Sequence, residues 1–143
     1  MSSHVTVDVY SNHDLGNYLL DETKRIAEYV LYKEGKNAVI SIVFVEDEKI
    51  LDLNKSYLRH NYITDVISFP LEKQDEGIEG EVYIDIEQAA RQAPEYGVSL
   101  KNEVSRLVIH GILHLLGYDD ATPDKKSVMS DKEDRYLREL QIS

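Results

Sequence analysis

The sequence predicts an α+β protein in which a small mixed sheet of about four strands packs against helices. Three observations support this fold class. Short segments rich in β-branched residues are interspersed with segments of helical periodicity, the chain ends in two consecutive helices, and its 143 residues suit a single core. We therefore treat residues 1–143 as one domain, whose strand order the sequence leaves open.

The first half of the chain contains two predicted strands and two predicted helices. Residues 5–10 alternate apolar and polar side chains, as a half-buried strand does, and residues 38–45 form an apolar run typical of a central strand. Between them we expect a helix that has Asp14 as its N-cap and ends at Gly35. A second helix is expected over residues 47–58.

The second half continues with two strands and three helices. Residues 66–69 and 81–86 are short apolar runs on either side of an acidic loop, which predicts a pair of adjacent strands. A helix is expected over residues 86–96, and Ser99 is a suitable N-cap for the next one. The last helix is expected to begin at residues 122–123, because proline fits the first helical position.

Residues 110–120, with the sequence HGILHLLGYDD, contain the most informative motif. His110 and His114 are four residues apart, so they lie one above the other on one helix face. The glycine three residues later can end the helix and turn the chain back, which would bring Asp120, or its neighbour Asp119, to the same point. Two imidazoles and a carboxylate suit zinc and leave one coordination position open.

The surroundings of these histidines favour a metal. The helix is apolar nearly all the way round, which indicates that it is buried. A buried imidazole without a partner would cost roughly 1–3 kcal/mol. A bound metal ion removes that cost, so we expect one divalent ion, zinc, at this site.

The same spacing is close to the metzincin protease signature H-E-x-x-H-x-x-G-x-x-H, whose glutamate is the general base. In this chain Gly111 stands at the position of that glutamate. Glycine inside a helix costs about 1 kcal/mol relative to alanine, so we expect close approach of another backbone or of a substrate at Gly111. Peptide hydrolysis by the glutamate-assisted route is not expected.

Three segments together resemble the YbeY family of bacterial endoribonucleases. The family signature H-G-x-x-H-L-x-G-Y-D-H is matched at residues 110–119, and the chain departs from it at Asp120, where the family most often has histidine. Residues 53–70 and 80–90 carry two further similar segments. The resemblance covers the chain from about residue 38 to its end.

The resemblance implies a fold in which the sheet shields one side of the metal helix, and the activity of a metal-dependent, single-strand-specific endoribonuclease in ribosomal RNA maturation and ribosome quality control. It implies His110, His114 and Asp120 as metal ligands. A carboxylate in place of a neutral histidine lowers the formal charge of the centre by one and makes it a weaker Lewis acid. Arg59 is the candidate catalytic residue, because its planar, permanently charged fork matches phosphate.

Three further residues have two interpretations each. Thr64 and Asp65 either contact the substrate or only form the turn before a strand. Asp119 is either the third ligand in place of Asp120 or a carboxylate that orients a ligand imidazole.

Charge and composition limit the partners. The net charge is −11, and residues 72–87 carry seven acidic side chains against one lysine, so an RNA site must be local. Lys49, Lys55 and Arg59 offer such a patch, whereas the acidic segment is a solvated loop or a surface for a basic ribosomal protein.

The chain has no cysteine, so nitrogen and oxygen must hold the metal. No apolar run approaches ~20 residues and no signal peptide is evident, so we expect a cytoplasmic protein without a membrane partner.

Three function classes therefore stay open. The first is an endoribonuclease that acts on a ribosomal RNA precursor, with a ribosomal subunit or a basic ribosomal protein as a further partner. The second is a ribosome-assembly factor without catalysis, which the acidic charge and the altered third ligand favour. The third is a zinc metalloprotease-type hydrolase, which the histidine spacing favours and Gly111 opposes.

Overall fold

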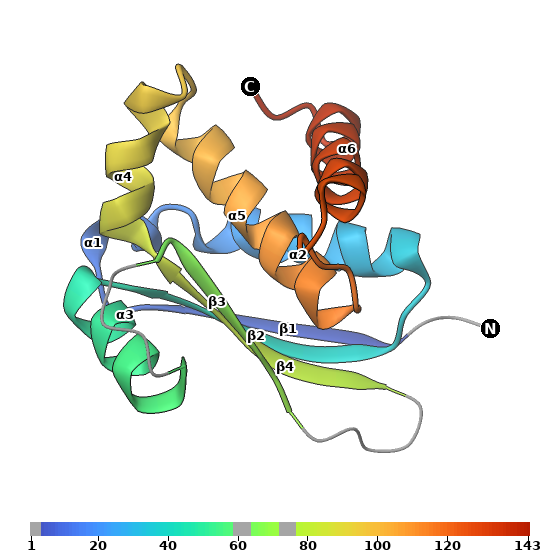
Figure 1. The fold of residues 1–143 in the computed structure, drawn as a ribbon, viewed down its shortest axis with the longest axis horizontal. Helices are drawn as coiled ribbons and strands as arrows, with labels where there is room; N and C mark the ends of the chain where they lie inside the picture. Colours follow the sequence, from blue (N-terminus) through green and yellow to red (C-terminus); the bar gives the residue numbers. More distant parts are fainter. Residues whose placement is uncertain (1–3, 59–63, 72–76) are drawn as a thin grey trace.

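A computed structural model of the protein describes residues 4–58, 64–71 and 77–143 (Figure 1). In chain order its elements are β1 (Val5–Ser11), α1 (Asp14–Asn17), α2 (Leu20–Glu34), β2 (Ala38–Val45), α3 (Asp47–Leu53), the π-helical turn η1 (Asn54–Leu58), β3 (Val66–Pro70), β4 (Ile78–Asp85), α4 (Ile86–Glu95), α5 (Leu100–Leu115) and α6 (Pro123–Glu139). The mixture of strands and helices confirms the predicted α+β class.

The four strands form one mixed sheet in the order β1-β2-β4-β3. β1, β2 and β4 are parallel, and β3 pairs antiparallel with β4 at one edge. Helices α2 and α5 lie on one face of this sheet, α6 packs against α5, and α3 lies on the opposite face (Figure 1). Strand order is the feature that the sequence left open.

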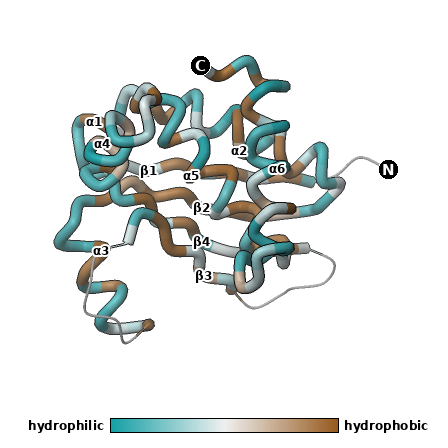
Figure 2. Tube along the Cα trace, turned by 45° about the horizontal axis from the view of Figure 1, so that its top comes forward, coloured by the Kyte–Doolittle hydropathy of each residue, from teal (hydrophilic) through white to brown (hydrophobic). Residues whose placement is uncertain are grey.

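Burial of apolar side chains between the layers holds the elements together. Figure 2 shows hydrophobic residues along the strands and through α5. The main core lies between the sheet and helices α2 and α5, and its fully buried residues include Ile40, Ile42, Val82, Val108 and Ile112. A smaller core on the other face holds α3 against the sheet through Val45, Ile50, Leu53 and Ile67.

The first predicted helix is divided in two, so Asp14 as its N-cap was wrong. The N-cap of the one-turn helix α1 is His13, whose Nδ1 accepts from the Leu15 N–H at 3.1 Å. Gly16 packs tightly here, because a Cβ at this position would lie 2.4 Å from the Ser11 Oγ atom. Because position 16 has no side chain, α1 can lie close to the end of β1, and α2 starts separately at Leu20.

Two other boundaries differ from the prediction. The helix expected over residues 47–58 ends at residue 53 and continues as η1, where the buried Asn54 donates from Nδ2 to Thr64 Oγ1 at 3.2 Å. The strand expected over residues 81–86 begins earlier, at Ile78, because β4 pairs with all eight residues of β2. It ends at Asp85, whose side chain caps α4.

A close approach at Gly111 is present, but side chains of the sheet make it, and not the backbone or substrate that was expected. A Cβ on Gly111 would lie 2.6 Å from Val82 Cγ1 and 3.3 Å from Ser68 Oγ. The Ser68 hydroxyl also donates to the Gly111 carbonyl oxygen at 2.9 Å. The glycine therefore lets α5 rest directly on β3 and β4, and the sheet covers this side of the helix.

We expect Gly111→Ala to destabilise the fold by roughly 1–3 kcal/mol through overpacking against Val82, although alanine is the better helix former by about 1 kcal/mol. Denaturant unfolding of metal-free protein measures this cost. In a Val82→Ala background the obstructing Cγ1 is absent, so the same substitution should become neutral or stabilising. An equal cost in both backgrounds would refute the proposed contact.

Candidate metal centre

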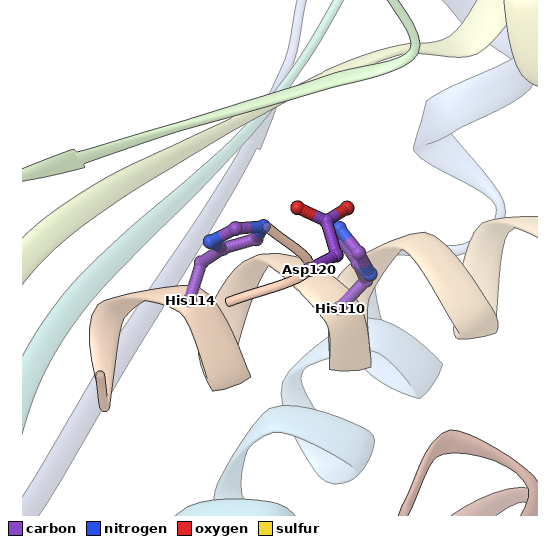
Figure 3. Close-up of side chains that lie close together, drawn as sticks. All are labelled: His110, His114 and Asp120. Atoms are coloured by element: carbon purple, nitrogen blue, oxygen red, sulfur yellow. The ribbon is translucent and has the colours of Figure 1, made fainter. Parts of the chain in front are cut away.

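His110, His114 and Asp120 come together in the structure as the motif predicts. Each offers one ligand atom, and these atoms lie within 4.8 Å of one another (Figure 3). The two imidazoles project from the same face of α5, with ring centroids 4.7 Å apart. Gly117 has a φ of +104°, and this left-handed turn after α5 directs the chain back so that Asp120 faces the histidines.

A buried carboxylate on α6 holds the first imidazole. Glu133 Oε2 lies 2.7 Å from His110 Nδ1, and the Glu133 Oε1 atom accepts from Arg106 Nη1 at 3.2 Å. Glu133 is only 6 % exposed. A proton held at Nδ1 by this carboxylate leaves Nε2 with its lone pair, which is the atom needed for a metal.

The sequence analysis missed Glu133, and a signal for it was present. The inner stripe of the last helix contains Met129, Tyr136 and Leu137. Glu133 falls on the same stripe, four residues after Met129. A carboxylate among core positions is rarely buried without a partner, so this position required one.

The site has an electrostatic environment suited to a cation. Burial lowers the pKa of His110, but Glu133, Asp120 and Asp65 together outweigh burial, so the His110 pKa lies above its usual value. Burial and the neighbouring His110 lower the pKa of His114, which favours its neutral, ligating form. The carboxylates around the two rings therefore attract a positive charge, from a proton or from a metal ion.

A groove leads to the three residues from the side of β3. It has a volume of about 540 Å³, and its lining includes Thr64, Asp65, Ser68, His110, His114 and Asp120. The Asp65 Oδ2 atom accepts from Gln92 Nε2 at 3.2 Å. The structure thus brings Thr64 and Asp65 to the site, and their contact with a substrate stays a prediction.

Asp119 stands apart from this group. Its carboxylate accepts from the Ala121 N–H at 3.0 Å and lies 3.5 Å from Lys125 Nζ, and the carboxylate beside His110 Nδ1 belongs to Glu133. Arg59 lies outside the described residues.

A second group of carboxylates lies where β4 ends and α4 begins. Ligand atoms of Asp47, Asp85 and Glu87 also lie within 4.8 Å of one another. Both Asp47 oxygens accept from Arg91, at 3.0 and 2.7 Å, so a guanidinium already supplies the positive charge here. Asp85 is fully buried, and its Oδ1 accepts from two backbone N–H groups of α4. Among the residues that the structure describes, no N–H or O–H group donates to its Oδ2.

Burial and the adjacent Asp47 raise the pKa of Asp85 from 3.8 to about 7. Between these values the folded chain retains a proton that the unfolded chain releases, so the free energy of unfolding should fall as the pH rises through this window. In wild type we expect the free energy of unfolding to fall by on the order of 2 kcal/mol over this window. Asp85→Asn mimics the protonated carboxyl and keeps the N-cap of α4, so this fall should be absent in the variant. Urea unfolding of metal-free protein at pH 4.5 and 7.5, roughly the ends of the window, tests this; parallel pH profiles for both proteins would contradict it.

In the part of the chain that the structure describes, no helix is long and apolar enough to cross a membrane.

Comparisons with known proteins agree with the fold. The family model described as Endoribonuclease YbeY matches residues 9–141. Endoribonuclease YbeY of Salinibacter ruber is 42 % identical over 121 residues, which cover 78 % of this chain and 77 % of that protein. Endoribonuclease YbeY of Carboxydothermus hydrogenoformans is 39 % identical over 128 residues, which cover 89 % and 90 % of the two chains.

A solved structure matches as well. The solution structure of TM1509 from Thermotoga maritima superimposes with a TM-score of 0.70 at 28 % identity, covering 94 % of this chain and 89 % of that one. The resemblance expected from the three sequence segments is thereby confirmed. The chain belongs to the YbeY family of endoribonucleases.

Proposed function

We propose that this protein is a metal-dependent, single-strand-specific endoribonuclease that acts in the cytoplasm in ribosomal RNA maturation and ribosome quality control. The observation that carries the proposal is the convergence of His110, His114 and Asp120 at a groove of about 540 Å³. The proposed substrate is a ribosomal RNA precursor, with a ribosomal subunit or a basic ribosomal protein as further partner.

The residues present fit a zinc ion. Two imidazole nitrogens and one carboxylate oxygen are ligands that zinc accepts, and three protein ligands leave one position open for chemistry. Glu133 fixes the orientation of His110, as carboxylates do for many zinc-binding histidines. When bound, such an ion polarises a phosphoryl oxygen and lowers the pKa of water.

The chain itself supplies the other requirements. The Asp120 carboxylate offsets part of the charge of a bound cation and so reduces its Lewis acidity. We assign Arg59 the binding of the scissile phosphate, because its fork donates two parallel hydrogen bonds to phosphate oxygens. Thr64 and Asp65 line the groove in which the strand would lie. With a net charge of −11, affinity for RNA must come from such local contacts.

Gly111 argues against the protease alternative. A side chain at position 111 would point at Val82 on the sheet, within 2.6 Å for Cβ alone. A glutamate there would therefore crowd the core rather than activate water beside the imidazoles. The assembly-factor alternative is favoured by Asp120 in place of the usual family histidine, and it predicts metal binding without cleavage.

One assay separates these functions. Wild-type protein loaded with zinc is incubated with single-stranded RNA and with casein, each with and without chelator. We expect RNA to be cut, chelator to stop the cleavage, and casein to stay intact. Cleavage of casein would replace the proposal by the protease, whereas no cleavage of RNA, alone or with ribosomal subunits, would favour the assembly factor.

The third ligand is tested by substitution at two adjacent aspartates. Asp120→Ala should weaken zinc binding by about tenfold or more, because one of three ligands is lost. Asp119→Ala should keep most of the affinity, since its carboxylate is engaged by Ala121 and Lys125. Asp120→His should rebuild the usual family site and bind zinc more tightly. Isothermal calorimetry ranks the three, and the reverse order would assign the ligand role to Asp119.

A further inference from the structure

The Asp120 side chain depends on its backbone for its position. It is exposed, and within residues 4–58, 64–71 and 77–143 its carboxylate accepts no hydrogen bond. His110, in contrast, is held by Glu133 at 2.7 Å. Whatever keeps Asp120 facing the two imidazoles must therefore act through the segment that links α5 to α6.

A cluster of polar side chains around Glu34 fixes the end of that segment that follows α5. Glu34, the last residue of α2, has a side chain only 9 % exposed. Its carboxylate accepts from the Tyr118 hydroxyl at 2.9 Å, from Lys132 Nζ at 3.1 Å and from the Tyr136 hydroxyl. Lys132 Nζ also lies 5.1 Å from the centroid of the Tyr118 ring. Two elements distant in sequence, α2 and α6, thus hold Tyr118, two residues before Asp120.

The other side of the segment is fixed as well. Thr122, two residues after Asp120, is the N-cap of α6, and its Oγ1 accepts from the Lys125 N–H at 3.2 Å. The backbone is therefore held by hydrogen bonds on both sides of Asp120, at Tyr118 and at Thr122. Breaking one of these hydrogen bonds would give the segment more conformations, and ordering each backbone residue costs roughly 1–2 kcal/mol.

We propose that Glu34, acting through Tyr118, is a positioning residue for Asp120 in the metal centre; this rests on the proposed metal-binding function. Burial acts most strongly on Glu34 and raises its pKa, but the three donors together outweigh it and keep the pKa below its usual value. The carboxylate is thus charged at neutral pH, and its hydrogen bonds are of the stronger, charge-assisted kind. The cluster around Glu34 contains no proposed metal ligand, so its effect on metal affinity is indirect.

The test compares two tyrosines whose hydroxyls each donate to a glutamate, Tyr118 to Glu34 on α2 and Tyr29 to Glu139 on α6. Tyr118→Phe removes the hydrogen bond to Glu34 and keeps the ring. Tyr29→Phe is the matched control, because it removes the Tyr29 hydroxyl, which donates to Glu139 on α6 at 2.6 Å, away from the Asp120 segment. Zinc affinity is measured by competition with a chromophoric chelator, and thermal unfolding confirms the fold. We expect about tenfold weaker zinc binding for Tyr118→Phe and for Glu34→Gln, and wild-type affinity for Tyr29→Phe.

A double-mutant cycle shows whether the effect passes through Asp120. In an Asp120→Ala background the positioned ligand is absent, so Tyr118→Phe should cause no further loss of zinc affinity. A loss that persists in that background, or equal affinities of the Tyr118→Phe and Tyr29→Phe variants, would overturn the inference while leaving the metal centre intact. A wild-type protein that binds no zinc would overturn the proposed metal centre and the inference with it.

Discussion

A His110→Ala, His114→Ala variant is expected to lose the zinc that the wild-type protein holds at about one ion per chain. Both imidazoles face Asp120, with ligand atoms of the three residues within 4.8 Å. Of the three proposed ligands only the exposed Asp120 carboxylate then remains, and one such ligand cannot retain zinc against water. Elemental analysis of protein purified without chelator measures the loss.

The control removes two other imidazoles. A His4→Ala, His13→Ala variant lacks as many histidines, but neither residue lies in the group around Asp120. It should keep its zinc. Added zinc at 100 times its dissociation constant should also raise the free energy of unfolding by about 2.7 kcal/mol in wild type and control, and not in the His110→Ala, His114→Ala variant. Unchanged zinc content in that variant would place the metal elsewhere.

Local signals in the sequence predict the metal helix and its ligands. The spacing of His110 and His114 follows from helical geometry alone, and Gly117 predicts the reversal that brings Asp120 back. Gly111 predicts a close contact by its cost in a helix. These features involve neighbouring residues, whose relative positions the backbone geometry largely determines.

The contacts that support the ligands could not be predicted from the sequence in the same way. Glu133 reaches His110 across 23 residues, and Tyr118 reaches Glu34 across 84. Such pairs depend on how helices pack, and a helical periodicity says which face is buried without saying against which neighbour. The strand order was open for the same reason, because β2 pairs with β4 across the segment that contains β3. The close fit of α1 on the sheet is also a tertiary feature, because a Cβ on Gly16 would lie 2.8 Å from the Phe44 Cβ atom on β2.

The proposed third ligand connects the metal centre with catalysis. As a ligand, the Asp120 carboxylate would lower the charge of the centre by one relative to three histidines. Stabilisation of the phosphate charge in the transition state then depends more on other cations, and the chain carries only 16 lysines and arginines against 27 acidic residues. Arg59 thus becomes the residue whose loss should affect cleavage most strongly.

We expect Arg59→Ala to reduce cleavage of single-stranded RNA by on the order of 10²–10³-fold while its fold and zinc content stay those of wild type. Arg59→Lys should restore part of the rate, because lysine keeps the charge and lacks the planar fork. The measurement is the cleavage rate at matched zinc content. Arg59 lies outside the described residues, so this prediction rests on the sequence and on the family to which the chain belongs.

A second arginine separates a specific contact from a general effect of charge. Arg25→Ala changes the net charge by the same amount, and Arg25 is an exposed residue of α2 paired with Glu22 at 2.6 Å. If the whole-protein field limits RNA binding, both variants should lose activity equally, and raising the salt concentration should remove the difference from wild type. If Arg59 contacts the scissile phosphate, only Arg59→Ala loses the rate, and it does so at saturating RNA as well. Equal losses of activity in the two variants would contradict a catalytic role for Arg59. Loss of zinc from the Arg59→Ala variant would show that Arg59 supports the metal centre instead.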